Sequence, residues 1–390
     1  MRATILAVLA NAIAAGDVLA GQAETPRKDP VVVIEQETHY TSNALDNDTS
    51  RADIYQVLRG SIEHAIDLPD ATLKLTAHAQ ATAYDKYSIE DDRSLALSAD
   101  LQQKLGERVE LRNTLSYNVS SEGDDLTLGD IVIGTRTLKQ RVTFATQAGF
   151  DLQNESALIV SASAFRERLG TTKFEELILP SKLEPDQTRF QGSVALKKTL
   201  GPVVGTLEGG AEIARVEELG SPPVSLSFAH YRLRGEIIWK VSDKTTLAMM
   251  GGGEYLRDAL GLYKALKPTY RVALVQALPF GAELRGSVGA AYDTSDTDDP
   301  LASWVRRAEI ELKIPASERL AVGTGFFHEV KDNVLMENRE RSHGVYAEVG
   351  YAVAAKLSIL ARVDYSRKYI TELDITEKTV DTFVKARLSL

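Results

Sequence analysis

The chain has 390 residues, contains no cysteine and carries a formal net charge of -10 at pH 7. The absence of cysteine excludes disulfide frameworks, cysteine-ligated metal centres and thiol nucleophiles. The acidic balance and the scattered basic residues argue against a nucleic-acid-binding protein, whose footprint is a basic face. After the N-terminal segment, no run is apolar for the roughly 18 residues that a membrane-spanning helix needs, so a helical membrane protein is also excluded.

The N-terminal residues have the pattern of a secretory signal peptide. The first two residues supply a short positive region, and residues 4–15 form a run of apolar and small side chains. Residues 21–23 (Gly-Gln-Ala) then fit a small-x-small cleavage site. We expect residues 1–23 to be a signal peptide and residues 24–390 to form one domain, with a short buried helix as the alternative for the N-terminal segment. Export without cysteine suits a bacterial envelope protein.

From residue 31 onward, the chain alternates apolar and polar side chains in segments separated by turn residues. In residues 72–83, for example, Leu73, Leu75 and four alanines share one face, and polar side chains share the other. Successive side chains of a strand point to opposite faces, so this alternation indicates strands with one apolar face. About 18 such segments occur, over residues 31–43, 53–67, 72–87, 93–105, 108–121, 138–151, 156–169, 187–199, 203–217, 227–240, 245–259, 265–278, 282–295, 303–314, 319–332, 342–353, 356–370 and 377–390.

The connections between these segments alternate in length. Tight turns, such as residues 69–70 and 153–155, alternate with longer polar links, such as 122–137 and 170–186. Short periplasmic turns and longer external loops are typical of outer-membrane barrels. We therefore predict an all-β fold, a transmembrane antiparallel up-and-down β-barrel of about 18 strands in the bacterial outer membrane. An even strand number places both termini in the periplasm.

Aromatic residues of the apolar faces support this prediction, because amphipathic rings favour the two membrane interfaces. A soluble sandwich, the alternative, would not sort them by height. We also expect the outer-membrane assembly machinery, outer-membrane lipid and lipopolysaccharide as partners; the apolar C-terminal strand, which ends at Leu390, partly matches the usual assembly signal. The predicted external girdle is Tyr117, Phe190, Tyr231, Tyr255, Tyr270, Tyr292, Phe326 and Tyr365, and the periplasmic one is Phe150, Trp239 and Tyr351.

The inward face of such a barrel carries charges of both signs in near balance. Eighteen strands enclose more space than side chains fill, so the lumen is expected to hold water or a plug. Only residues 24–30 lie between the predicted signal peptide and the first predicted strand, so we expect no plug domain and no large plugged transporter of the siderophore type. The charges either form cross-strand pairs that stabilise the wall or leave some arginines free to bind sugar hydroxyls or carboxylates, with Arg232 and Arg234 beside His230 as the best local candidates. The predicted pore-lining residues are Arg112, Arg141, Arg189, His230, Arg232, Arg234, Glu236, Arg271, Arg285, Arg307 and Arg362.

Residues 170–186 are unusually apolar for an external loop. They include Phe174 and the run Leu177, Ile178 and Leu179, and such a segment either folds inward as a constriction or packs on the rim. Motifs of catalysis are missing: the six histidines are dispersed, none has a zinc spacing such as HExxH, and no G-x-S-x-G elbow occurs. We expect no enzymatic activity, no metal site and no cofactor.

The first predicted hairpin carries a resemblance to a known family. Residues 40–45 (Tyr-Thr-Ser-Asn-Ala-Leu), followed by residues 53–55 (Asp-Ile-Tyr), resemble the start of outer-membrane β-barrel porins encoded beside exopolysaccharide genes. The Ser-Asn-Ala pattern is also similar to the opening of the barrels of surface-lipoprotein export proteins. The first resemblance implies a passive conduit that lets a hydrophilic polymer reach the cell surface with periplasmic polysaccharide-export proteins as partners.

We therefore expect an outer-membrane conduit for exopolysaccharide export. The alternative is a general or substrate-selective diffusion porin for small solutes, and a structural or adhesive barrel is the third candidate.

Overall fold

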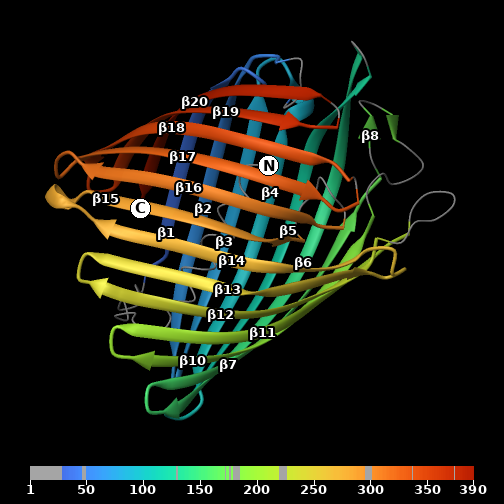
Figure 1. Ribbon diagram of the computed structural model, residues 1–390. Helices are drawn as coiled ribbons and strands as arrows, with labels where there is room; N and C mark the ends of the chain where they lie inside the picture. The colour runs from blue at the N-terminus through green and yellow to red at the C-terminus, as the bar shows by residue number, and fades with distance from the viewer. Residues whose placement is uncertain are drawn as a thin grey trace.

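The computed structural model describes residues 29–45, 50–128, 131–171, 173–174, 177–178, 185–218, 226–294, 301–335, 337–372 and 374–390. These residues form a closed antiparallel barrel of 18 strands (Figure 1), which confirms the predicted fold class and strand number. The predicted signal peptide, residues 1–23, lies outside the described residues. Within the described ranges, no helix is long and apolar enough to cross a membrane.

The strands of the barrel wall are β1–β7 and β10–β20, and β8 and β9 are two-residue strands in a loop. Their bounds are β1 Val31–Thr41, β2 Asp53–Leu68, β3 Ala71–Tyr84, β4 Asp92–Lys104, β5 Val109–Leu128, β6 Ile131–Gln153, β7 Ser156–Leu169, β8 Lys173–Phe174, β9 Leu177–Ile178, β10 Gln187–Leu200, β11 Val203–Val216, β12 Phe228–Ser242, β13 Thr245–Asp258, β14 Lys264–Ala277, β15 Glu283–Asp293, β16 Ser303–Pro315, β17 Leu320–Asn333, β18 Arg339–Ala354, β19 Leu357–Ile370 and β20 Ile375–Ser389. Two short 3-10 turns, η1 (Ser88–Glu90) and η2 (Pro279–Gly281), lie in connections.

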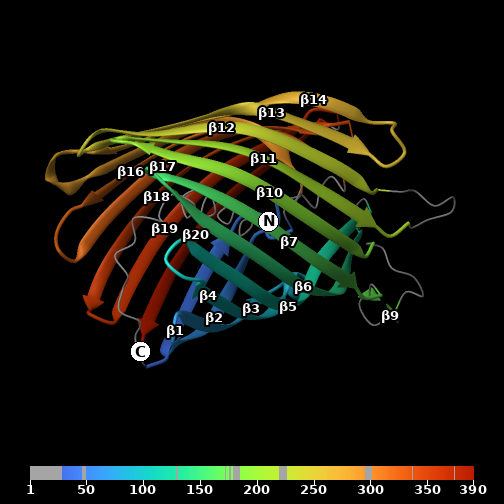
Figure 2. The same cartoon turned by 90° about the horizontal axis from the view of Figure 1, so that it is seen from below.

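Each wall strand pairs with its neighbours in the sequence, and β7 pairs with β10 across the loop that holds β8 and β9. The first and last strands, β1 and β20, pair over Val33–Thr41 and close the barrel, as Figure 2 shows. The chain adopts strands because its apolar and polar side chains alternate with the strand period. On β12, Tyr231, Leu233 and Ile237 are 47%, 60% and 45% exposed on the outer surface, while His230, which directly precedes Tyr231, is buried and points inward.

The two ends of the barrel differ. Tight turns gather at one end, where residues such as Asp70 and Gly201 adopt the positive φ angles, 61° and 59°, that short hairpins require. The longer connections lie at the opposite end, here called the outer end because external loops are the longer ones in such barrels. The outward-facing apolar band between the ends is the surface that meets lipid, and the protein is located in the bacterial outer membrane.

Most of the predicted aromatic girdle lies on this outward face. At the outer end, the exposed rings are Tyr117, Phe190, Tyr231, Tyr270, Phe326 and Tyr365, and Trp239 and Tyr351 are exposed near the tight turns. Tyr292 is the exception. It is only 7% exposed and packs in an apolar cluster inside the barrel, so its assignment to the lipid-facing girdle is wrong.

Candidate functional site

The predicted pore-lining arginines of the wall are largely held in ion pairs with acids on the same face. Arg232 Nε lies 3.1 Å from Glu208 Oε1, and Arg234 Nε lies 3.1 Å from Glu254 Oε1. Opposite charges on neighbouring strands stabilise a sheet in this way. The two guanidinium groups are therefore engaged, which favours the interpretation of these residues as wall-stabilising pairs over that of a free sugar or carboxylate site.

The other predicted pore-lining residues follow the same pattern with two exceptions. Glu236 and Arg271 lie on the inward face of β12 and β14, and neither forms an ion pair with a described residue. The remaining pairs are Arg112 with Asp100, Arg141 with Glu167, Arg189 with Glu212, Arg285 with Glu283, Arg307 with Glu309 and Glu329, and Arg362 with Glu348 and Asp364.

One hairpin leaves the wall and enters the lumen. β14 pairs with β13 along its length, but its ladder with β15 ends at Tyr270 and Ala290, so Lys264–Thr269 have no partner on the β15 side. Beyond Ala290, the end of β15 and the start of β16 turn inward together. Thr294, at the end of this hairpin, contacts side chains of β10 and β11, which lie several strands away around the wall. Only a segment inside the barrel can reach them.

The bend begins where two backbones approach closely. Gly289 on β15 lies opposite Arg271 on β14, and a Cβ atom at Gly289 would be 2.8 Å from the carbonyl oxygen of Tyr270. Real side chains do not tolerate such a contact, so only glycine fits here. Just past this point, Thr269 Oγ1 donates a hydrogen bond to the Ala290 carbonyl at 2.9 Å. The glycine and this hydrogen bond fix the place where β15 separates from β14.

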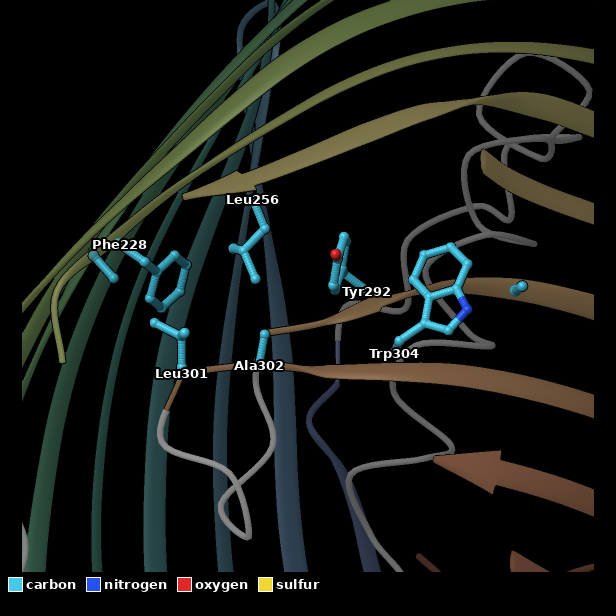
Figure 3. Packing of buried hydrophobic residues seen from close by; sticks show 8 residues of the cluster. Phe228, Leu256, Tyr292, Leu301, Ala302 and Trp304 are labelled. Atoms are coloured by element: carbon cyan, nitrogen blue, oxygen red, sulfur yellow. The ribbon is translucent and has the colours of Figure 1, made fainter. Parts of the chain in front are cut away.

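An apolar cluster holds the hairpin against the inner surface of the wall (Figure 3). Leu256 and Ala302 are fully buried, and Phe228 is 2% exposed. The Trp304 and Tyr292 rings meet edge to face at 4.9 Å, a favourable aromatic geometry. The cluster comprises Ala214, Phe228 and Leu256 from the wall and Ala290, Tyr292, Leu301, Ala302 and Trp304 from the hairpin.

Polar contacts fasten the same hairpin to the wall. Glu254 is fully buried, and its Oε2 accepts a hydrogen bond from the Tyr292 backbone N–H at 2.8 Å. Glu212 Oε2 accepts one from the Thr294 hydroxyl at 2.9 Å, and the guanidinium of Arg189 donates to the Thr294 carbonyl. We call Arg189, Glu212, His230 and Glu254 the hairpin latch.

His230 lies between the two carboxylates of the latch. Its Nδ1 is 3.8 Å from Glu212 Oε2, and its Nε2 is 3.5 Å from Glu254 Oε2. Its ring also meets the Tyr292 ring edge to face, with centroids 5.8 Å apart. His230 therefore packs against both carboxylates and against the hairpin. The sequence indicated that His230 faces inward but gave no sign of its contact with the hairpin.

A second buried polar cluster lies at the outer end of the β1–β20 seam. His39 Nδ1 is 3.1 Å from Asp381 Oδ1, and His39 Nε2 is 3.0 Å from Glu37 Oε2. The imidazole also stacks on Tyr55, with centroids 4.4 Å apart, and the Tyr55 hydroxyl donates to Asp381. These contacts join the first, second and last strands. Sequence reasoning missed the cluster because its residues lie more than 300 positions apart.

The described strands of the apolar external loop, β8 and β9, pair with β6 and with each other. Phe174 in β8 pairs with Thr135 on β6, and Leu177 in β9 pairs with Phe174. Figures 1 and 2 show β8 and β9 beyond the barrel mouth, which favours packing at the rim over an inward constriction. Leu179, also predicted for this constriction, lies outside the described residues. The segment that enters the lumen was predicted as plain wall strands.

The described residues contain no cluster of side chains that could bind a metal ion. No group of three or more histidine, aspartate or glutamate side chains is placed to hold a metal ion among these residues. The buried histidines contact carboxylates and aromatic rings.

Comparison with known proteins finds likeness at the level of the fold. No family model matches the chain, and no curated protein matches its sequence. The solved structures include the copper transporter OprC (8% identity, TM-score 0.58, covering 94% of this chain and 81% of that one) and FpvA from Pseudomonas aeruginosa bound to a ferric pyoverdine (10%, 0.55, 94% and 72%). OpdK from Pseudomonas aeruginosa with vanillate also matches (9%, 0.53, 94% and 100%).

These comparisons correct the expected function. The named barrels are described as a copper transporter, as a barrel bound to a pyoverdine–iron complex and as a barrel bound to vanillate, and none is described as a polysaccharide exporter, so the expectation of an exopolysaccharide conduit is wrong. The alternative of a diffusion porin for small solutes fits no better, because a hairpin occupies part of the lumen that an open porin leaves to water. The family resemblance of residues 40–45 and 53–55 stays a prediction, since no family model matches.

Proposed function

We propose that this chain is a receptor-type uptake barrel of the outer membrane, in which the β15–β16 hairpin gates the lumen. The observation that carries the proposal is the hairpin itself, which crosses from β15 to contact β10, β11 and β13 inside the barrel. A segment packed this way blocks passage on its side of the lumen. Transport then requires the hairpin to be released by a ligand that binds better to the released state.

The proposed ligand is a small metal chelate that enters from the outer end. Two observations support this class. Solved barrels of similar fold are described as a copper transporter and as a receptor bound to a pyoverdine–iron complex. The hairpin also offers aromatic rings beside cations: Lys267 Nζ lies 5.1 Å from the Trp304 ring centroid and 5.5 Å from that of Tyr292. An anionic chelate with aromatic arms competes for both kinds of contact.

The test is the conductance of the refolded protein in a planar bilayer. We expect the unmodified barrel to be silent and the double variant Glu212→Gln/Glu254→Gln to conduct, because the variant weakens the contacts that hold Thr294 and Tyr292. The matched control is Glu63→Gln/Asp100→Asn. It removes two inward carboxylates that pair with Lys74 and Arg112 in the wall, far from the hairpin.

The outcomes are distinguishable. A silent control and a conducting latch variant support the gate, and addition of a ferric chelate or a copper salt to the unmodified barrel then identifies the ligand by the channel activity that it induces. Steady open channels from the unmodified protein would show that the hairpin does not gate the lumen. Ligand binding without any change in conductance would indicate that the barrel is a receptor and does not transport the ligand.

A further inference from the structure

Four basic side chains form a row on the outward face of β17–β20, near the outer end. The strand register places them side by side. His328 pairs with His343, His343 pairs with Arg367, and Arg367 pairs with Lys378. The side chains are exposed or half-buried, and they face away from the lumen. We call this set the cationic row: His328, His343, Arg367 and Lys378.

The height of the cationic row is set by an apolar row directly below it. The apolar row consists of residues two positions nearer the tight-turn end of each strand, about 7 Å along the strand. Its rings, Phe326 and Tyr365, are 44% and 39% exposed and mark the lipid interface. Val345 and Val380 complete it, at 49% and 37% exposure. The cationic row therefore lies at the level of the outer-leaflet headgroups.

The cationic row has no acidic partners among the described residues. Arg367 and Lys378 lie directly opposite each other, and like charges in this position destabilise a sheet. The next residues along the same two strands behave differently, because they face the lumen: Lys368 Nζ is 3.0 Å from Glu377 Oε2. The lumenal Lys368 thus forms an ion pair with an acidic side chain of the chain itself, whereas the outward-facing Arg367 and Lys378 do not.

The same arrangement recurs elsewhere on the wall. Arg257 on β13 lies directly opposite Lys264 on β14, and both are exposed on the outward face at the outer end. Neither forms an ion pair with a described residue. A repeated outward pair of uncompensated cations, placed above the half-buried ring of Tyr255 and the exposed ring of Tyr270, indicates that the missing negative charge comes from the surroundings of the barrel.

We propose that the cationic row binds the phosphate groups of a phosphorylated glycolipid of the outer leaflet, of the lipopolysaccharide class. Arg367 and Lys378 contact the phosphates, and the imidazoles of His328 and His343 add hydrogen-bonding groups along the same line. The acyl chains lie against the apolar row below. Charge complementarity and position both select this ligand, since the outer leaflet is the anionic surface present at this height.

The test compares two double variants of the full chain, refolded in detergent. Arg367→Gln/Lys378→Gln removes one arginine and one lysine from the cationic row. The control, Arg319→Gln/Lys356→Gln, removes one of each from exposed tight turns at the opposite end of the barrel. Each lost charge should weaken binding of purified lipopolysaccharide about fivefold, so the first variant should bind about 25-fold more weakly and the control as tightly as the unmodified chain.

Two further ligands decide the chemistry. Lipopolysaccharide treated with phosphatase should bind the unmodified chain as weakly as intact lipopolysaccharide binds the cationic-row variant. Equal affinity of the two double variants would overturn the proposal, and so would full affinity for the dephosphorylated glycolipid. Inorganic phosphate that binds as tightly as the glycolipid would assign the row to soluble anions instead. Heat-modifiable migration on gels checks that each variant has folded.

Discussion

Glu254 is the most deeply buried carboxylate that contacts the in-turned hairpin, which makes Glu254→Gln the most informative substitution. Glu254 is fully buried, and it accepts hydrogen bonds from the Tyr292 backbone N–H at 2.8 Å and from Arg234 Nε at 3.1 Å. Glutamine keeps one carbonyl oxygen for these two donors and turns an amide N–H₂ toward the other. One hydrogen bond to a charged group is therefore lost.

Such a bond contributes about 2 kcal/mol, so the equilibrium between docked and released hairpin should shift about 30-fold toward release. Because the chain contains no cysteine, a single Ser303→Cys substitution gives a clean reporter at a hairpin position that is fully buried. The rate of its reaction with a soluble maleimide follows the released population when opening and closing are fast. We expect that rate to rise about 30-fold with Glu254→Gln.

The control in the same reporter background is Glu63→Gln, which breaks an ion pair with Lys74 on the wall away from the hairpin. It should leave the labelling rate unchanged. An unchanged rate with Glu254→Gln, or an equal rise with the control, would refute the reasoning that this carboxylate holds the hairpin. Fast labelling of the reporter without any second substitution would show that the hairpin is not docked at all.

Three further substitutions test the packing and the closure of the barrel. Leu256→Ala should weaken the docking free energy of the hairpin by about 3 kcal/mol, because it opens a cavity in the lumenal cluster. The Ser303→Cys reporter should then react faster than it does with the control Leu233→Ala, since Leu233 is 60% exposed on the lipid-facing side of the wall. Gly289→Val places a Cβ atom 2.8 Å from a β14 carbonyl, so the yield of heat-modifiable, refolded barrel should fall sharply. Asp381→Asn weakens the contacts to His39 at the β1–β20 seam and should lower the unfolding free energy by about 2 kcal/mol in a urea titration.

The number and order of the strands could be predicted because lipid and lumen differ in polarity. Leu233, Tyr231 and Ile237 alternate with His230 and Arg232 on β12, and this period-2 pattern is a direct consequence of one face meeting lipid. The same pattern occurs on each wall strand, so the strand number followed from the sequence. Loop tips carry no such periodicity, and their placement did not follow.

The in-turned hairpin could not be predicted for the same reason. Tyr292 and Trp304 lie on the face of β15 and β16 that continues the lipid-facing side, and an apolar side chain there fits lipid equally well. In the structure, this face packs instead on Phe228 and Leu256 at the inner surface of the wall. Both surroundings are apolar, so hydrophobic periodicity does not distinguish them. The distinguishing contacts, from Thr294 to β10 and β11, are long-range.

One residue of the motif at the first hairpin has a clear structural role. Asp53, its most distinctive residue, is 1% exposed, and its carboxylate accepts hydrogen bonds from the backbone N–H groups of Lys86 and Tyr87 in the next external connection. The aspartate thus orders a loop beside the barrel mouth. These contacts give the aspartate a structural role at this position, and the family resemblance stays a prediction.

The early end of the β14–β15 ladder has a mechanical consequence. This ladder joins eight residue pairs, from Tyr270–Ala290 to Ala277–Glu283, whereas β13 and β14 are joined over thirteen. It is the shortest ladder between wall strands of the described barrel. Pro268, which has no N–H group, and the two lysines of this stretch keep the free edge of β14 from recruiting a foreign strand. Under a pulling force applied across the wall, the barrel should therefore tear first between β14 and β15, and it should open there into one curved sheet that runs from β15 through the β20–β1 seam to β14.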